Sequence, residues 1–275
     1  MDYPRNLREF DRLFAHKDAC LRFLEQVRWG ERGFACQQCG AREFWALGTG
    51  LRRCKTCRFK NSVKTGTIFE SSRLPLKMWF YAVWWITAQK TGVSALDLQR
   101  DVGLGSYRSA WLLLHKIRNA MTHADRSLLT GEVELGELQV GSITVFAAAE
   151  FSGAKRIGRI RLARATGAWD TFLSGSLAKA ASLHAPAELL RHVPRAAPLP
   201  THSRTALLQE HVARWLKGTL HGRLESKHLD SYLEEFTFRF NHRDAKSRGL
   251  LFQRVMENAV RIEPAPYRAI TSRKG

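Results

Sequence analysis

The sequence lacks any apolar run long enough to cross a membrane. Its longest run, Met78–Ala88, has 11 residues, whereas a membrane-spanning helix needs about 20. The first residues also lack the basic segment and apolar stretch of a secretory signal, so we expect a cytoplasmic protein with no membrane partner. Cysteine is scarce too: there are five, which in that compartment favours metal ligands or free thiols over a disulfide framework.

Acidic residues are few. Asp+Glu number 25 against 44 Lys+Arg, which leaves a formal net charge of +19 and a pI near 10.4. That much positive charge indicates a polyanionic partner, and nucleic acid is the first candidate. The chain is not a disordered basic tail, because 44% of it is hydrophobic and 10% is aromatic, with eight Trp. Its 275 residues suit one large domain or two to three small ones.

Hydrophobic spacing predicts helices separated by β-rich segments. Helical periodicity covers residues 1–32, then resumes after Pro75 and runs to Lys90. Ser94 and Ser106 are expected N-caps of two further helices, the first ending at Gly103 and the second near residue 123. We also predict helices over 205–217 and 225–241 and strands over 131–141, 143–151 and 156–165, whereas residues 168–205 show no clear pattern.

Four of the five cysteines have the spacing of a metal site. Cys36 and Cys39 form one CxxC pair, and Cys54 and Cys57 form a second pair 14 residues later. Each pair makes a tight turn that aims two sulfurs at one point, so a short β-hairpin would complete a closed four-thiolate site for structural Zn²⁺. The alternative is two unconnected redox or free-thiol pairs. Cys20, in a helical apolar stretch, is expected to be a small buried side chain.

The segment around these cysteines is basic and aromatic. Phe44, Trp45 and Phe59 stand among its cations, and such a surface can hold phosphates and stack on bases. The alternative is a solvated ribbon that only docks another protein. The predicted nucleic-acid contacts of this segment are Arg52, Arg53, Lys55, Arg58 and Lys60.

The helices around Gly103 and Gly105 have the pattern of a helix-turn-helix. In that motif the second helix enters the major groove with its N-terminal residues near base edges. Tyr107 and Arg108 occupy that position here, and Lys116 and Arg118 would meet phosphate farther along the helix. A plain three-helix bundle would produce the same apolar pattern.

The order of motifs resembles a known family. KTGTIFESSRLPLKMWFYAVWW follows the cysteine segment, and GEVELGELQVG follows the helix-turn-helix pattern; WLKGTLHG and HLDSYLEEFTFRFNHR come later. This sequence is similar to insertion-sequence transposases that join an N-terminal zinc ribbon to a helix-turn-helix and an RNase H-like DDE domain. The resemblance runs from about residue 15 to residue 268 and is weakest between 150 and 205.

The resemblance implies a catalytic site that is incomplete in this chain. Members of the family hold two Mg²⁺ ions with three acidic or substitute groups on the RNase H-like sheet. The first of these groups falls at Gly136, and a glycine cannot bind a metal ion. Strand alternation places Glu134 on the same face as Gly136 and Glu137 on the opposite face. We therefore predict a DNA-binding regulator, accessory or domesticated factor that has lost nuclease chemistry.

Two other functions stay open at this point. An active, Mg²⁺-dependent transposase would use the relocated carboxylates Glu134, Asp170 and Glu210, which are otherwise expected to be solvated surface groups. A scaffold for RNA or for a protein complex would use the same basic surface. The resemblance implies transposon-end-like duplex DNA as partner, a location in the bacterial cytosol or nucleoid, and pairing with a second copy or with an active transposase. Arg239 and Arg243 extend the predicted nucleic-acid contacts.

The predicted fold class is α+β with several domains. A helical arm (1–32) precedes the zinc ribbon (33–70) and a three-helix helix-turn-helix unit (71–125). A reduced RNase H-like α/β domain (130–262) and a basic tail (263–275) complete the chain.

Overall fold

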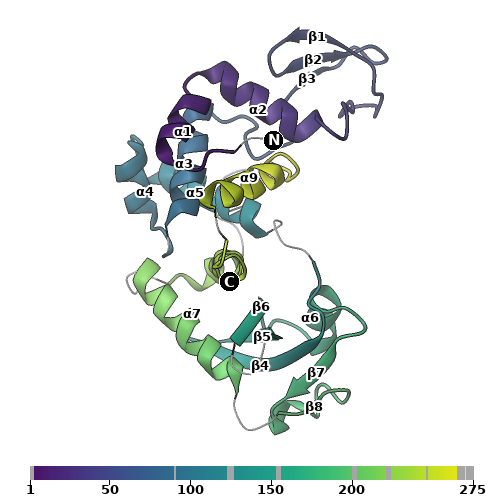
Figure 1. The fold of residues 1–275 in the computed structure, drawn as a ribbon, viewed down its shortest axis with the longest axis vertical. Coiled ribbons are helices and arrows are strands. Elements are labelled where there is room, and N and C mark those ends of the chain that lie inside the picture. The colour runs from purple at the N-terminus through teal and green to yellow at the C-terminus, as the bar shows by residue number, and fades with distance from the viewer. Residues whose placement is uncertain are drawn as a thin grey trace. The chain divides into compact units, whose positions relative to one another are not determined.

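The computed structural model describes residues 3–89, 91–122, 127–152, 156–199, 203–220, 224–245, 247–264 and 270. The chain divides into two compact units (Figure 1). We call them the helical unit, formed by Met1–Ala124 and Ala245–Ser272, and the sheet unit, formed by Asp125–Asp244 and Arg273–Gly275. Most of the predicted basic tail lies outside the described residues. Within the described ranges, no helix combines the length and apolar character needed to span a membrane.

The three helices predicted after Pro75, Ser94 and Ser106 begin and end close to their predicted positions, whereas the helix over Arg248–Ala259 was not predicted. The Ser94 hydroxyl accepts a hydrogen bond from the N–H of Asp97 at 3.1 Å and caps one helix, which Gly103 ends with a left-handed φ of 71°. The predicted N-terminal helical arm consists of two helices. The helices are α1 (Leu7–Leu13), α2 (Lys17–Trp29), α3 (Leu76–Ala88), α4 (Ala95–Val102), α5 (Tyr107–Thr122) and α9 (Arg248–Ala259).

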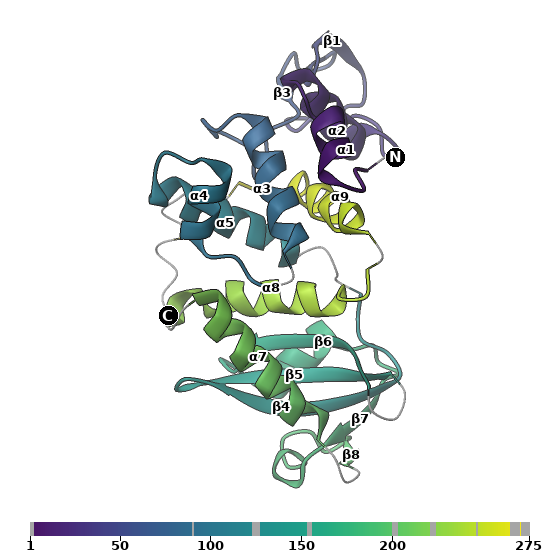
Figure 2. The ribbon, with the colours of Figure 1, turned by 60° about the vertical axis from the view of Figure 1, so that its left-hand side comes forward.

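The C-terminal helix α9 belongs to the core of the helical unit. It contacts α2, α3 and α5 (Figure 2). The fully buried Phe252 ring lies 5.6–6.0 Å from five other aromatic rings, those of Phe10, Phe14, Phe23, Phe80 and Trp84. The predicted domain 130–262 therefore extends too far, because the structure assigns residues from Ala245 onward to the helical unit. Burial of Phe252 among the N-terminal aromatics accounts for this boundary.

A small antiparallel sheet follows α2. Its strands are β1 (Phe44–Gly48), β2 (Leu51–Cys54) and β3 (Lys60–Ser62), paired in that order. The predicted hairpin thus carries a third strand. Arg28 of α2 donates to the carbonyls of Ser62 and Val63 at 3.1 and 2.7 Å, which fastens the ribbon to the helix.

The sheet unit is built on a mixed five-stranded sheet in the order β6-β5-β4-β7-β8. The strands β4, β5 and β6 pair antiparallel, β7 pairs parallel with β4, and β8 pairs parallel with β7. All three strands predicted over 131–165 are present. The strands are β4 (Glu132–Val140), β5 (Ile143–Ser152), β6 (Arg156–Arg164), β7 (Ser182–Ala185) and β8 (Ala197–Pro198).

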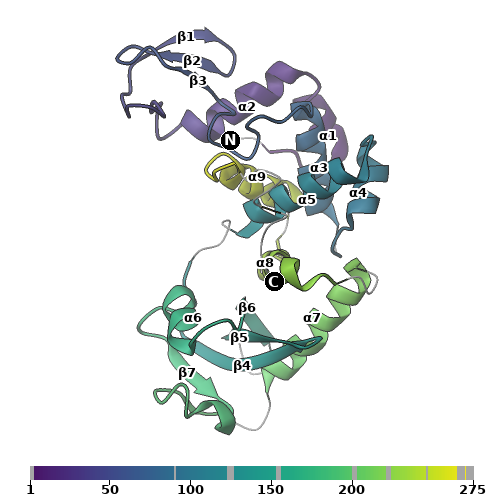
Figure 3. The same ribbon diagram turned by 180° about the vertical axis from the view of Figure 1, so that it is seen from behind.

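Helices cover both faces of this sheet (Figure 3). On one face Val133 and Leu135 of β4 pack with residues of α6 (Trp169–Ser176). On the other face Leu138 and Val140 pack with residues of α7 (Arg204–Leu220) and α8 (Leu229–Asn241). The apolar stripe predicted for 225–241 faces this second core, because Leu229, Tyr232, Leu233 and Phe236 are buried in it. The alternation of β4 therefore assigns even-numbered side chains to the α7 face.

In the segment 168–205, which the sequence left unassigned, the described residues before α7 form short elements only. They are α6, β7, β8 and the 3₁₀ turn η1 (Ala187–Leu189); a second 3₁₀ turn, η2 (Ser226–His228), precedes α8. Such elements are too short to show a hydrophobic period.

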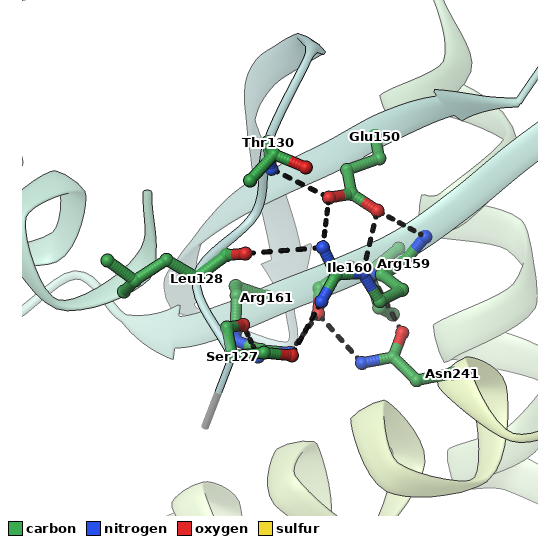
Figure 4. A network of polar contacts seen from close by, with 8 residues as sticks. All are labelled: Ser127, Leu128, Thr130, Glu150, Arg159, Ile160, Arg161 and Asn241. Carbon is green, nitrogen blue, oxygen red and sulfur yellow. Dashed lines mark hydrogen bonds and ion pairs between the residues drawn. The ribbon is translucent and has the colours of Figure 1, made fainter. Parts of the chain in front are cut away.

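A polar network fixes the start of the sheet unit to its sheet (Figure 4). Glu150 of β5 accepts hydrogen bonds from the N–H of Thr130 and from the Nε of Arg159, both at 2.8 Å. Burial opposes ionisation of Glu150, but Arg159 outweighs it and holds the pKa of that carboxyl below its usual value. Asn241 of α8 pairs with the backbone N–H and C=O of Ile160 at 2.8 and 3.1 Å. The partly exposed Arg159–Glu150 ion pair and the Asn241 amide thereby connect the segment before β4, the strands β5 and β6, and α8.

Candidate metal centre and nucleic-acid interface

The four predicted ligands lie together in the ribbon. Their Sγ atoms are all within 4.8 Å of one another, and the Cys36–Cys57 and Cys39–Cys54 pairs are each 3.6 Å apart. A tetrahedral Zn²⁺ ion with Zn–S bonds of about 2.3 Å separates its sulfurs by roughly 3.8 Å. The four thiols therefore fit a closed structural zinc site. In the described part of the chain, no other group of three or more His, Cys, Asp or Glu side chains converges in this way.

Two matching turns aim these thiols. The N–H of Gly40 donates to the Cys36 carbonyl at 2.8 Å, and the N–H of Arg58 donates to the Cys54 carbonyl at 3.1 Å. The residue after each second cysteine is left-handed, with φ 73° at Gly40 and φ 64° at Arg58. Glycine adopts this conformation freely, whereas it costs any other residue roughly 1–2 kcal/mol.

Asn61 supports the site from behind, and sequence analysis missed it. It is 1% exposed, its Oδ1 accepts from the N–H of Gln37 at 2.9 Å, and its Nδ2 lies 3.5 Å from the Cys36 sulfur. Such a partner orients a metal ligand and stabilises its thiolate. The sequence offered one signal for this role, since Asn61 is a polar residue only four positions after Cys57 in a segment predicted to be β-rich.

The surroundings shift the thiol pKa values in opposite directions. Burial opposes ionisation of Cys36, but hydrogen bonds from the Cys39 N–H and the Asn61 amide help lower its pKa to about 6. At Cys57 the Phe59 N–H favours the thiolate, yet burial and the neighbouring thiols raise its pKa to about 12. Four thiolates this close repel one another, and a bound Zn²⁺ supplies the positive charge that lets all four ionise.

Most of the predicted basic residues of the ribbon are on its surface. Arg53, Lys55, Arg58 and Lys60 are exposed. Arg52 is different, because its guanidinium lies 4.2 Å from the ring centroids of both Trp29 and Phe44 and pairs with Glu25 at 3.8 Å. Burial lowers its pKa, an effect that Glu25 offsets. Arg52 thus attaches the ribbon to α2, and unlike the other four cations it is only partly exposed.

The predicted contacts in the helix-turn-helix region divide in the same way. Tyr107 (54% exposed) and Arg108 are on the surface of the first turn of α5, which the Ser106 hydroxyl caps by accepting from the N–H of Ser109 at 3.2 Å. Lys116 and Arg118 are buried, and their side chains donate to the carbonyls of residues 68 and 93 at 3.4 and 3.0 Å. These two cations face the core of the unit, so their placement does not match the predicted phosphate contacts.

The two predicted contacts near the end of the sheet unit also have structural partners. Arg239 donates to the fully buried Glu235 at 2.8 Å, one turn earlier in α8. The exposed Arg243 donates to the carbonyls of Phe240 and Gly158 at 2.7 and 3.2 Å. Burial of its guanidinium is the main cause that lowers its pKa. Arg239 thus forms an ion pair within α8, and Arg243 connects the end of α8 to β6, which the sequence pattern did not reveal.

The three candidate catalytic carboxylates do not form one cluster. Asp170 is exposed in the first turn of α6, on the face of the sheet opposite α7. Glu210 is exposed on α7. Glu134 is fully buried on β4, so the expectation of a solvated carboxylate is wrong for this residue.

Glu134 caps the N-terminus of α7. Its carboxylate accepts from the N–H groups of Arg204 and Thr205 at 3.0 and 2.8 Å and from the hydroxyls of Ser203 and Thr205 at 2.9 and 3.0 Å. The guanidinium of Arg204 lies 3.7 Å away. The first N–H groups of a helix have no partner within it and favour an anion, which explains why a buried carboxylate is stable here.

The same helix turn closes over Gly136. A Cβ on Gly136 would lie 2.5 Å from Oγ1, 2.7 Å from Cβ and 2.8 Å from Cγ2 of Thr205. Real Cβ atoms essentially never approach other atoms below 3.0 Å. Glycine at 136 is therefore required by the close approach of α7, and Thr205 occupies the space that a longer side chain would need.

These features define a structural zinc-ribbon protein with a second, mixed-sheet unit. Comparison with known proteins identifies its relatives: residues 16–60 match a family model described as the transposase zinc-ribbon domain. A protein of Halobacterium salinarum, described as an uncharacterized protein in transposable element ISH50, is 31% identical over 126 residues. The aligned region covers 44% of this chain and 41% of that relative. No solved structure matches. Residues 16–60 are therefore similar to the zinc-ribbon domain of transposases, and less than half of the chain is similar to a protein of a transposable element.

Proposed function

We propose that this chain is a DNA-binding relative of insertion-sequence transposases whose nuclease site is closed. It would act as a regulator, as an accessory to an active transposase or as a domesticated factor, through its helical unit. The main support for the loss of nuclease activity is that a side chain at position 136 would clash with Thr205, so this position cannot hold a metal-binding carboxylate. The burial of Glu134 as a helix cap supports it, because this carboxylate has four donors and no open side for a metal ion.

The distribution of charge supports DNA binding by the helical unit. Met1–Ala124 and Ala245–Ser272 contain 26 Lys+Arg against 12 Asp+Glu, whereas Asp125–Asp244 contain 16 against 13. The net charge of +19 is therefore concentrated in the unit that carries the zinc ribbon. A basic unit attracts the phosphate backbone and makes affinity strongly dependent on salt.

Two surfaces of this unit suit the duplex contacts that we propose. The start of α5 presents Tyr107 and Arg108 beside a short glycine turn after α4, as expected of a recognition helix. The ribbon presents Arg53, Lys55 and Lys60. The mixed sheet with helices on both faces is consistent with the RNase H-like interpretation of the sheet unit.

A paired cleavage and gel-shift assay tests the proposal. The substrate is duplex DNA carrying the flanks of the native locus, with Mg²⁺ or Mn²⁺ added. We expect salt-sensitive binding without nicking or strand transfer. Metal-dependent cleavage that is lost in Glu134→Gln would show that a relocated site exists and would overturn the proposed loss of activity. Failure of the folded, zinc-loaded protein to bind DNA would overturn the binding role.

The ribbon arginines are expected to respond differently to substitution. Arg53→Ala removes an exposed cation, so it should reduce the slope of log Kd against log salt by about 1 with little change in stability. Arg52→Ala removes the stacked guanidinium, and we expect a loss of about 1–2 kcal/mol in stability with little direct change in the salt slope. Denaturant unfolding and binding at several salt concentrations measure both effects. Equal salt slopes for the two variants would contradict the assignment.

A further inference from the structure

One face of the ribbon sheet carries an aromatic side chain within a row of cations. Trp45 on β1 pairs with Arg53 on β2, and Arg53 pairs with Lys60 on β3. Paired residues on neighbouring strands point to the same face, so the three side chains form one row across the sheet. Trp45 is 39% exposed, and Leu47, farther along the same strand, is 46% exposed. A tryptophan this exposed on a strand of a small ribbon is not explained by core packing.

Arg58 is held next to this row by a strained backbone. Its guanidinium lies 4.5 Å from the centroid of the Trp45 ring. It occupies the left-handed position that Gly40 fills in the first cysteine turn. Strain at a non-glycine residue persists where the side chain has a use, and here the strained residue stacks on the exposed indole. The ribbon therefore displays an exposed indole with a guanidinium over its ring, among further cations.

This combination matches the chemistry of an unpaired nucleic-acid strand. Aromatic rings and guanidinium planes stack on bases, while neighbouring cations follow the phosphates. Bases inside a duplex are already stacked on one another, so only unpaired or terminal bases offer a free face.

We propose that this ribbon face binds unpaired DNA bases, with Trp45 and Arg58 as the stacking surface and Arg53 and Lys60 as the phosphate contacts. The proposal rests on the proposed DNA-binding function and refines it. The helical unit would then recognise DNA whose strands are partly open or end in a single-stranded extension, in addition to duplex.

The test compares three fluorescent DNAs with the full, zinc-loaded chain. They are a single strand of 12 nucleotides, a blunt duplex of the same sequence, and that duplex with a single-stranded 3′ extension. We expect Trp45→Ala to weaken binding of the single strand and of the extension by about 5- to 100-fold, the range for loss of one stacked base. Binding of the blunt duplex should change less than about twofold, because the contacts of Arg53 and Lys60 with its phosphates remain. Trp45→Phe should retain most of the affinity.

Arg58→Gly separates the role of the side chain from the fold. Glycine fills the matching position at Gly40, so this variant should keep its zinc and its thermal stability. It should still lose affinity for the single strand by several-fold. Arg12→Ala, which removes an exposed cation on α1, is the matched control for loss of charge.

The outcomes distinguish this proposal from the proposed function. Equal weakening of single strand and blunt duplex in Trp45→Ala, or no weakening of either, would overturn the stacking proposal while DNA binding stands. If the wild-type protein binds none of the three DNAs, the proposed function fails and the stacking proposal fails with it.

Discussion

Gly136→Asp, which introduces the carboxylate that the resemblance implies at this position, is expected to unfold the sheet unit instead of giving a protein that cleaves DNA. The new Cβ would lie 2.5 Å from Oγ1 of Thr205, and the new carboxylate would be enclosed near the buried Glu134. Overpacking and an unpaired buried charge together cost about 3–5 kcal/mol. Denaturant unfolding of the variant, followed by the cleavage assay, measures both consequences.

Matched variants identify the cause of this loss. Gly136→Ala introduces the steric contact without the charge, so it should cost about 1–3 kcal/mol. Thr205→Ala leaves the Thr205 Cβ position at 2.7 Å and should relieve Gly136→Ala only in part, whereas Thr205→Gly removes the three atoms that would lie nearest to the new Cβ. A stable Gly136→Asp protein that cleaves DNA with Mg²⁺ would show that α7 moves away and that the site can be reopened.

Removal of zinc is expected to unfold the ribbon and abolish DNA binding. Residues 34–64 contain few buried apolar side chains, so the metal supplies most of their folding energy, about 10–16 kcal/mol in comparable small sites. A strong chelator, or Cys54→Ser, should eliminate the bound zinc and the gel shift. Hydrogen exchange should show loss of protection in β1–β3, while the sheet unit stays protected.

Cys20→Ala is the control for this experiment. Cys20 is fully buried in α2 and lies outside the cluster of four thiols, and burial raises the pKa of its thiol to about 11. This variant should keep one zinc ion per chain and its DNA binding. Full zinc content in Cys54→Ser, or loss of zinc in Cys20→Ala, would contradict the four-thiolate site.

Local signals in the sequence predicted several elements and the metal site. The CxxC spacing brings the four sulfurs together through short turns, which need few contacts from elsewhere in the chain. The ends of α4 follow from Ser94 and Gly103, because capping is a local hydrogen-bond requirement. The stripe of α8 was likewise visible, since one face of that helix is apolar.

The roles of the charged residues could not be predicted in this way. In the sequence, Arg52, Lys116 and Arg118 cannot be told apart from the exposed cations. In the structure, their side chains contact carbonyls or aromatic rings of residues that are distant in the sequence. Glu134 likewise cannot be told apart from a surface carboxylate in the sequence, but the N-terminus of α7, about 70 residues later, binds its carboxylate. A cation or carboxylate becomes structural when distant segments provide its partners.

The sequence by itself determined the zinc ligands, the basic character of the chain and the glycine at position 136. The tertiary structure decided that α9 completes the N-terminal core, that Glu134 caps α7, and that Thr205 fills the space beside Gly136. The physical reason is the range of the interactions. Ligand spacing and net charge are properties of the chain itself, whereas burial and close packing depend on which distant segments fold against one another.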